Sequence, residues 1–416
     1  MLAFNTALLW ALTYFRAGVE LYDVMIVGAG PVGSYPAYRL AELGYKVIVF
    51  ERRTEIGEAV CCTGIIGKEC FDRFPIVNHG ILTQASSAKF FSPFGKCLEV
   101  GKETAQAYVI DRIVFDSTLA QNAQSKGAEY LLSARVVDVS LRDDRVSAKV
   151  ECKDKVIDFD AKIALISSGF GGALTRRLGL GEINDFVLGA QAEVDVGKLE
   201  EVEVYFGQEV APGFFGWLVP TYSGKALAGL LSRRSPGSYL KNLLASLKTQ
   251  GKIVSSEAKI TYGGIPLTPL PRTYMDRLLV VGDAAGQVKP TTGGGIYYGL
   301  LCADIATDVA NNALRADGFS ARRLSNYEKS WKKKLGRELE IGYSARKLYE
   351  KLSDRQIEQI FDIIQANRIH ESLLQSPDFS FDWHGNLILR ALRDRRLYQA
   401  IRNVAKSPFP PQSIAK

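Results

Sequence analysis

The sequence predicts an α/β protein with a discontinuous core domain, an inserted antiparallel sheet and a helical C-terminal region. Residues 22–51 read as an apolar strand, a glycine-rich turn, a helix and a second apolar strand. Residues 186–264 change to short stretches of alternating polarity separated by Gly and Pro, which is typical of antiparallel strands. After Gly299 the chain becomes helical and charged. A length of 416 residues allows two or three domains.

The first unit carries the pattern G-x-G-x-x-G at Gly28, Gly30 and Gly33. The first glycine makes the tight turn, the second lets the backbone approach a pyrophosphate, and the third lets the helix pack closely on the strand. Glu51 ends the second strand, 23 residues after Gly28, where a carboxylate can accept a hydrogen bond from a ribose hydroxyl. The strand, turn and helix together predict a Rossmann-like dinucleotide site.

The remaining elements follow in order along the chain. We expect core strands at 107–110, 129–139, 145–152 and 162–167, a helix at 111–126, and inserted strands at 187–194, 202–206, 214–219 and 226–231. A short buried strand at 278–281 then ends in Gly282 and Asp283, and a loop with Pro290, Gly293, Gly294 and Gly295 precedes a helix. Free backbone N–H groups in such a loop can face an anionic group, so this segment is a second contact for a long dinucleotide.

These two segments closely resemble the flavoproteins of the aromatic-hydroxylase (glutathione-reductase-like) superfamily. The resemblance implies that FAD is the cofactor, that Asp283 binds its ribityl–phosphate part and that the loop 290–295 runs beside the isoalloxazine ring. It also implies a cofactor contact for Arg112 and a backbone contact to adenine for Val136. The superfamily usually has Asp-Gly after the strand at 162–167, where this chain has Ser167-Ser168-Gly169. The missing Asp leaves both NADPH and a protein such as reduced ferredoxin as electron donors.

Two further segments resemble the geranylgeranyl reductase family. Residues 55–64 match the loop in which a cysteine approaches the flavin, and Cys62 is the aligned cysteine, with Cys61 extra. Residues 212–220 are similar to the family signature P-x-x-Y-x-W-x-F-P, with Phe215 for Tyr and Val219 for Phe. The resemblance implies hydride transfer from reduced FAD to isolated C=C bonds of a geranylgeranyl or polyprenyl chain, in an ether lipid, a chlorophyll-type precursor or a quinone precursor.

A polyprenyl substrate needs a long apolar tunnel. Phe206, Phe214, Phe215, Trp217, Leu218 and Val219 either line this tunnel or form the core of the inserted sheet. We name as substrate-binding residues Tyr205, Phe206, Phe215, Trp217 and Pro220. Hydrogenation also requires a proton, for which Cys62 is the candidate by family position, either as donor or as a gate for flavin movement. Tyr205 and Tyr222 are weaker alternatives as donors, and a buried, inert cysteine is the alternative interpretation of Cys62.

Two other functions fit the same motifs. Phe215-Gly-Trp-Leu-Val-Pro differs by one aromatic residue from the halogenase pattern W-x-W-x-I-P, so a flavin-dependent monooxygenase or halogenase is the runner-up. A non-redox FAD-dependent isoprenoid cyclase is the third hypothesis.

We expect four regions. Residues 1–20 form an N-terminal extension; 21–75, 101–175 and 265–320 form the FAD-binding domain; 76–100 and 176–264 form the substrate domain; and 321–416 form the helical region.

Charge and composition limit the remaining functions. The net charge of +7 is mild, and without a recognition motif it does not favour nucleic-acid binding. Residues 322–337 carry seven Lys/Arg and one acid, and Trp331, Leu335 and Leu339 share one helix face. This helix either rests on anionic lipid headgroups, giving a peripheral membrane contact, or packs its apolar stripe on the protein body.

Six scattered cysteines and three histidines predict neither a disulfide scaffold nor a metal site. We read His79, His370 and His384 as structural or surface residues. No apolar run reaches 18 residues, and the apolar residues 2–15 lack a basic flank, so we expect a cytoplasmic protein without a transmembrane helix.

Overall fold

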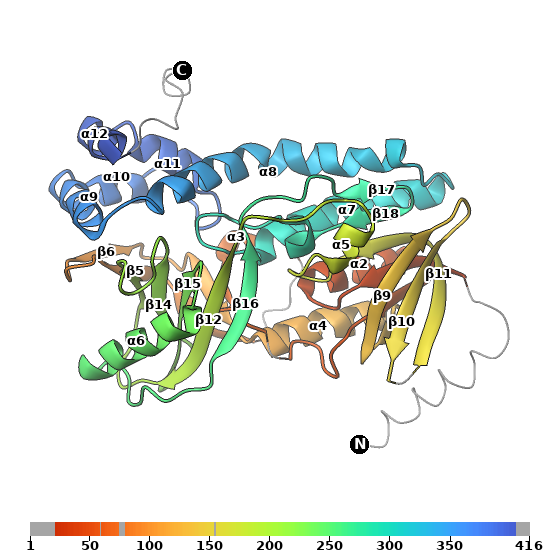
Figure 1. Ribbon diagram of the computed structural model, residues 1–416, viewed down its shortest axis with the longest axis horizontal. Coiled ribbons are helices and arrows are strands. Elements are labelled where there is room, and N and C mark those ends of the chain that lie inside the picture. Colours follow the sequence, from red (N-terminus) through yellow and green to blue (C-terminus); the bar gives the residue numbers. More distant parts are fainter. Residues whose placement is uncertain (1–20, 59, 75–79, 154, 405–416) are drawn as a thin grey trace.

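The computed structural model describes residues 21–58, 60–74, 80–153 and 155–404. The expected N-terminal extension, 1–20, and His79 lie outside the described residues. Within the described part the chain forms three sheets, with helices against the core sheet and a group of helices at the C-terminal end (Figure 1). The predicted α/β class is confirmed.

The core sheet has eight strands, and its central part is parallel in the order β18-β11-β1-β2-β8. Its strands are β1 (Leu21–Val27), β2 (Val47–Phe50), β8 (Glu129–Leu131), β9 (Ala134–Leu141), β10 (Val146–Cys152), β11 (Lys155–Ile166), β17 (Tyr274–Met275) and β18 (Leu278–Val280). Its helices are α2 (Pro31–Glu42), α4 (Arg112–Ser125), α5 (Ala173–Arg177), α7 (Ile296–Arg315) and the short 3-10 helix η1 (Gly282–Ala285). The expected strand at 129–139 is in fact two strands, because Ser133 takes a positive φ of 54° between them.

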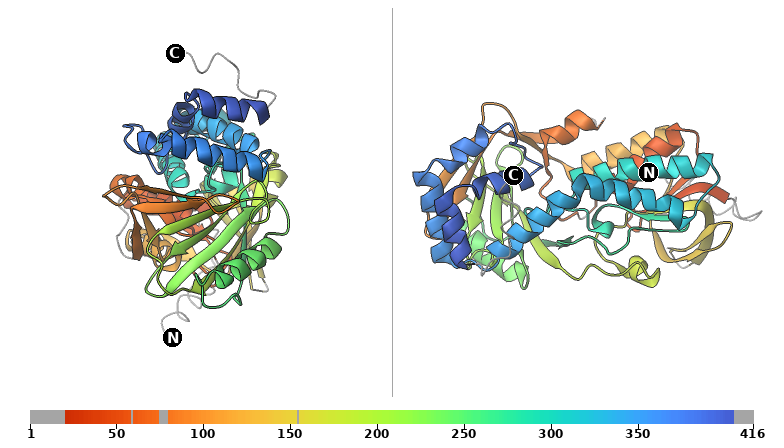
Figure 2. Two further views of the ribbon diagram at one scale, coloured as in Figure 1. Left: turned by 90° about the vertical axis from the view of Figure 1, so that its left-hand side faces the viewer. Right: turned by 90° about the horizontal axis from the view of Figure 1, so that it is seen from above.

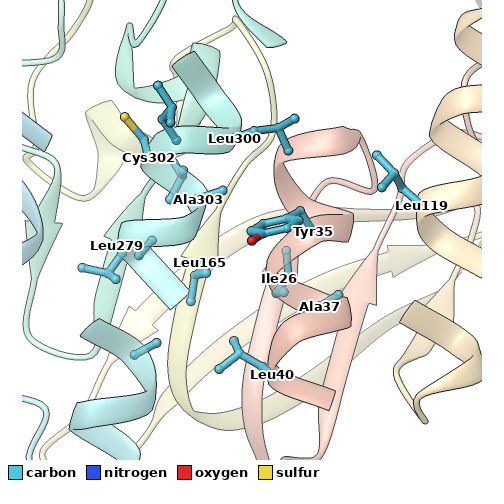
Figure 3. Close-up of a cluster of buried hydrophobic side chains, with 14 of the residues drawn as sticks. Ile26, Tyr35, Ala37, Leu40, Leu119, Leu165, Leu279, Leu300, Cys302 and Ala303 are labelled. Carbon is cyan, nitrogen blue, oxygen red and sulfur yellow. The ribbon is translucent and has the colours of Figure 1, made fainter. Parts of the chain in front are cut away.

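Alternation along β1 separates the two sides of the core sheet. Val24 and Ile26 face α2, α4 and α7, where apolar residues of all three helices gather into one buried cluster (Figure 3). Met25 and Val27 face the other way, into a second buried cluster with residues of β9 and β10. Because successive strand residues point to opposite faces, a continuous apolar run is what a strand buried on both sides requires.

The inserted sheet has seven strands in the order β16-β12-β15-β14-β13-β5-β6 and is antiparallel except for the β13–β5 pair. Its strands are β5 (Ser87–Phe91), β6 (Cys97–Gly101), β12 (Phe186–Asp195), β13 (Val202–Phe206), β14 (Phe215–Pro220), β15 (Lys225–Ser232) and β16 (Thr261–Pro266). Helix α6 (Pro236–Thr249) covers one face with Leu240, Leu243, Leu244 and Leu247. A third sheet joins β3 (Ile65–Gly67), β4 (Ile81–Ala85) and β7 (Ala107–Ile110), and α3 (Lys68–Arg73) follows β3.

The C-terminal helices lie along one side of the molecule and connect its two halves. Helix α8 (Ala321–Tyr349) runs over α7 and reaches the inserted sheet, beyond which come the four helices α9 (Asp354–Ala366), α10 (Ile369–Leu374), α11 (Gly385–Ala391) and α12 (Arg395–Val404) (Figures 1 and 2). Trp331, Leu335 and Leu339 are at most 4% exposed and belong to the core cluster. The apolar stripe of α8 therefore packs on the protein body, as the second of the two alternatives predicts, and a peripheral membrane contact stays a prediction. None of the helices in the described residues is both long and apolar enough to span a bilayer.

Candidate active site

A cavity of about 1060 Å³ lies between the core domain, the inserted sheet and the C-terminal helices. Each part of the chain contributes to its wall. The lining includes 28–32, 51–53, 61–65, 167–170 and 291–296 from the core side, Val202, Val204, Phe206, Phe215, Trp217 and Val219 from the inserted sheet, and Arg346, Tyr349, 379–381 and His384 from the C-terminal region.

The glycine-rich turn between β1 and α2 forms one end of the cavity. Gly28 has a φ of +105°, and a Cβ on it would stand 2.5 Å from the Ser167 carbonyl oxygen. A Cβ on Gly33 would stand 2.0 Å from the Gly28 carbonyl oxygen, so this glycine permits the close approach of helix to turn. Gly30 differs: no atom lies within 4 Å of a Cβ placed there, and the residue lines the cavity. The crowding at Gly28 and Gly33 and the open space at Gly30 are what the pattern requires of its three glycines, and the pyrophosphate contact of Gly30 stays a prediction.

Two charged side chains stand beside this turn. Glu51 lines the cavity and accepts hydrogen bonds from the backbone N–H groups of Ala29 and Arg53, both at 3.0 Å. Arg112 also lines the cavity and donates through Nε and Nη2 to Asp116 at 3.1 and 2.9 Å. The bidentate pair fixes the direction of the guanidinium, which is 13% exposed.

Asp283 lies on the cavity wall at the end of β18, directly after the tight turn at Gly282, whose φ is +72°. Burial raises the pKa of the Asp283 carboxyl, and the charge of Arg112 acts in the opposite direction. A Cβ on Gly295 would stand 2.6 Å from Asp283 Oδ1, so the loop that follows can pass the carboxyl only with glycine there. Gly293 and Gly294 line the cavity as well, at the N-terminus of α7.

The inserted sheet supplies an apolar wall through strand alternation. Val202, Val204 and Phe206 of β13 and Phe215, Trp217 and Val219 of β14 face the cavity. The rings of Phe206 and Phe215 lie 6.4 Å apart, and those of Phe215 and Trp217 lie 6.0 Å apart. Leu218, which lies between Trp217 and Val219, is fully buried in the cluster under α6, as is Phe214, the residue before β14.

Two predicted substrate residues therefore stand elsewhere. Tyr205 belongs to the cluster under α6 and hydrogen-bonds to Glu203 and Lys252, and Pro220 is not among the residues that line the cavity. The alternation of strand residues is the cause, since Tyr205 lies next to Phe206 and Pro220 next to Val219. Phe206, Phe215 and Trp217 do line the cavity.

Among the predicted cofactor residues, Gly282 and Pro290 are not themselves lining residues, although their neighbours Asp283 and Thr291 are, and Val136 is buried in the second core cluster, outside the lining residues. The contact of Val136 with adenine stays a prediction.

The two neighbouring cysteines both line the cavity beside the edge of the inserted sheet. Cys62 Sγ accepts a hydrogen bond from the Gly64 N–H at 3.4 Å, and its carbonyl accepts one from Gln191 Nε2 at 3.2 Å. Cys61 Sγ donates to the Thr261 carbonyl at 3.6 Å, and burial raises the pKa of its thiol. The loop therefore presents two thiols in different surroundings.

Three residues of the cavity wall were missed by the sequence analysis. His384, interpreted as structural or surface, lines the cavity together with Lys289 and Arg346. His384 Nε2 lies 2.9 Å from the Phe381 carbonyl, which can only accept, so Nε2 carries the proton and Nδ1 accepts from the Thr291 hydroxyl at 2.7 Å. Burial lowers the pKa of His384 to about 4, with the charge of Lys289 adding to the effect, so the ring is neutral at pH 7.

Arg346 binds the loop that carries the predicted flavin contacts. Its guanidinium donates to the carbonyl oxygens of Pro290 at 3.2 Å, Gly213 at 2.8 Å and Thr291. Burial lowers the pKa of Arg346 to about 10, which leaves it protonated at neutral pH. No local signal in the sequence marks Arg346 and His384, because each reaches the loop from a part of the chain far along the sequence. Lys289 lies in the loop itself, but its partner Asp382 is 93 residues away.

Comparisons with known proteins agree with this geometry. A family model described as an NAD(P)-binding Rossmann-like domain matches residues 26–72. A curated digeranylgeranylglycerophospholipid reductase from Methanocaldococcus jannaschii is 32% identical over 363 residues, covering 83% of this chain and 91% of the relative. A digeranylgeranylglycerophospholipid reductase 2 from Methanothermobacter thermautotrophicus is 32% identical over 361 residues, covering 83% and 92%.

Solved structures share the fold. A geranylgeranyl bacteriochlorophyll reductase-like protein from Thermoplasma acidophilum superposes with a TM-score of 0.81 and 25% identity, covering 93% of this chain and 98% of that one. A flavin-dependent brominase superposes with a TM-score of 0.64 at 13% identity, covering 91% of this chain and all of that one, and shows the fold alone.

The fold and the cavity define a dinucleotide-binding protein with an apolar chamber built by an inserted sheet. Within that class, the chain belongs to the digeranylgeranylglycerophospholipid reductase family. The predicted membership in the geranylgeranyl reductase family is thereby confirmed.

Proposed function

We propose that this protein is an FAD-dependent reductase that hydrogenates the isolated C=C bonds of geranylgeranyl chains carried by a glycerophospholipid. The observation that carries the proposal is that the dinucleotide-binding turn and the apolar wall of β13 and β14 line the same cavity. Family membership identifies the substrate class, since the curated relatives are named for reduction of the digeranylgeranyl glycerophospholipid.

The residues of the core side fit FAD. The open space at Gly30 leaves room for a pyrophosphate at the N-terminus of α2, where the helix dipole favours negative charge. We assign Glu51 to the adenosine ribose, Asp283 to the ribityl–phosphate part, and the flavin loop (residues 289–295) to the ring. When bound and reduced, FAD supplies the hydride for the alkene.

The inserted sheet fits a hydrocarbon substrate. Its cavity face offers aromatic and branched aliphatic side chains, and an isoprenoid chain has only methyl, methylene and alkene groups to bury. Phe206, Phe215 and Trp217 are the substrate-binding residues we propose. They exclude water and hold the chain, while hydride transfer requires a proton at the second alkene carbon.

We assign that proton to the thiol of Cys62, which lines the cavity. Cys61 is a matched control, because it is the neighbouring thiol of the same wall and donates instead to a backbone carbonyl. Cys62→Ala should abolish most turnover and leave FAD binding intact, whereas Cys61→Ala should retain activity within a few-fold. Equal loss in both variants would remove Cys62 from the mechanism.

We also propose NADPH or a protein such as reduced ferredoxin as electron donor, and a cytoplasmic protein that takes its substrate at the membrane surface. Ser168 occupies the place of the Asp that the related hydroxylases carry, which favours the protein donor. Stopped-flow reduction of the bound flavin by each donor tests this choice.

The central experiment is anaerobic. The purified protein is reduced with dithionite and mixed with a digeranylgeranyl glycerophospholipid, and flavin absorbance is followed together with the product mass. Reoxidation with a gain of two hydrogens per double bond supports the proposal. A flavin that stays reduced until air is admitted contradicts it, and a hydroxylated or halogenated product would then identify a monooxygenase or halogenase. A rearranged lipid of unchanged mass would identify a cyclase.

A further inference from the structure

A buried ion pair lies in the wall of the cavity, at the first residue of the flavin loop. Lys289 Nζ stands 2.6 Å from Asp382 Oδ1, and the two side chains are 7% and 2% exposed. Lys289 lines the cavity beside Gly294, since a Cβ on Gly294 would stand 2.7 Å from Lys289 Cε. The pair joins the loop to a segment 93 residues further along the chain.

The surroundings of the pair are mostly aromatic. The ammonium lies 5.8 Å from the ring centroid of Tyr298 and 5.2 Å from that of Phe381. Asp382 Oδ2 is buried without a hydrogen-bond partner in the described structure, and a Cβ on Gly67 would stand 1.9 Å from it. A buried ion pair seldom stabilises a fold more than apolar residues of the same volume would. An electrostatic effect on the cavity therefore explains the pair at this place better than a contribution to the stability of the fold does.

The two charges are not equivalent with respect to the cavity. Lys289 belongs to the lining residues and Asp382 does not, so the positively charged residue is the member of the pair nearer to the cavity. Charges act strongly in such poorly solvated surroundings. Burial is the larger cause of the lowered pKa of His384, and the charge of Lys289 is the second. The ammonium therefore acts electrostatically on another group of the same wall.

We propose that Lys289 is the charge that raises the reduction potential of the bound flavin, and that Asp382 attenuates it. Reduction adds electrons to the flavin, so a positive charge beside the cavity stabilises the reduced form and a negative charge destabilises it. The proposal rests on the FAD-binding part of the proposed function and is independent of the lipid substrate. Both residues then act on the flavin through their charges, whereas residues that only held the loop in place would not need to be charged.

The test is an anaerobic redox titration of the holoenzyme against a reference dye, without lipid. Lys289→Met should lower the potential and Asp382→Asn should raise it, each by at least a tenfold change in the ratio of oxidised to reduced flavin, which is about 30 mV for a two-electron couple. Lys289→Arg, which keeps the charge, should stay near the wild-type value, and the double variant Lys289→Met/Asp382→Asn should fall between the two single variants.

Controls separate this role from a structural one. Lys162 and Asp23 form a pair at 2.8 Å on β11 and β1, outside the residues that line the cavity, and Lys162→Met and Asp23→Asn should leave the potential unchanged. FAD affinity is measured for every variant by quenching of flavin fluorescence. Three results would overturn the proposal and indicate that the pair only holds the loop. They are shifts of the reduction potential of the same sign in the two single variants, shifts no larger than in the controls, and loss of FAD without a shift of the potential. A wild-type protein that binds no FAD would instead refute the proposed function.

Discussion

Gly30 and Gly33 lie three residues apart in one turn, and the structure predicts opposite consequences for the same substitution. Gly30 has φ −68° and ψ 178°, a backbone that any residue adopts, and a Cβ there meets nothing within 4 Å. Because Gly30 is the N-cap of α2, where Ala is less favourable than Gly, Gly30→Ala should lower the stability of the apoprotein by about 1 kcal/mol or less. A Cβ on Gly33 would stand 2.0 Å from a backbone oxygen, so Gly33→Ala must displace the helix or the turn.

The magnitudes follow from these contacts. Overpacking of this kind costs about 1–3 kcal/mol and more when backbone must move, so Gly33→Ala should unfold at clearly lower denaturant concentration. In Gly30→Ala the methyl group occupies the space that we assign to the pyrophosphate. Loss of one or two hydrogen bonds to a charged group, about 1.5–3 kcal/mol each, corresponds to at least a tenfold weaker binding of FAD.

The assay combines two measurements on each variant: urea unfolding of the apoprotein, and titration of FAD by fluorescence. Gly30→Ala should be stable and bind FAD poorly, and Gly33→Ala should be unstable. Wild-type affinity for FAD in Gly30→Ala would refute the assignment of the open space to the pyrophosphate. Unfolding of Gly30→Ala would show that the apparent space is needed by the fold itself.

Three more predictions concern the other walls. Phe206 separates the cavity from the buried residues around Phe361, whose ring centroid is 5.8 Å from that of Phe206. Phe206→Ala should therefore extend the cavity and raise the turnover of a 25-carbon chain relative to that of a 20-carbon chain about tenfold. An unchanged ratio of the two turnovers in a competition assay would contradict this role. The pKa of His384 is about 4 in the folded protein and about 6.5 in the unfolded chain, so on acidification the unfolded chain binds the proton first. The contribution of the neutral ring to the free energy of unfolding is therefore full above pH 6.5 and is lost as the pH falls toward 4. The decline should amount to roughly 3 kcal/mol in urea unfolding and disappear in His384→Gln, and an equal decline in that variant would assign it to other groups. Trp331 is 1% exposed, so Trp331→Ala should lower the free energy of unfolding by about 3–5 kcal/mol and leave the binding of the protein to anionic vesicles unchanged. A loss of vesicle binding at constant stability would instead support a contact of this face of α8 with lipid.

The dinucleotide turn could be predicted in detail because its physics is local. Gly28, Gly30 and Gly33 act on atoms a few residues away, and Glu51 follows within the same βαβ unit. The helix at 111–126 was likewise set by a local feature, since Asp111 caps it by accepting from the N–H groups of Ile113 and Val114. Alternation also showed that the strands of the inserted sheet have two different faces.

Which of those faces meets the cavity was decided by tertiary structure. Tyr205 and Phe206 are both aromatic neighbours on β13, and only the packing of α6 on one side assigns Tyr205 to the core and Phe206 to the cavity. The same holds for the apolar stripe of α8, which a basic sequence makes equally suitable for lipid or for protein.

The charged part of the cavity wall depended on tertiary structure entirely. Lys289 and Asp382 meet across 93 residues of chain, and Arg346 and His384 reach the same loop from the C-terminal helices. A glycine pattern determines its own turn because backbone sterics act over a few bonds. A buried charge is determined by whichever partner the folded chain brings within hydrogen-bond distance, and neither periodicity nor composition records that partner.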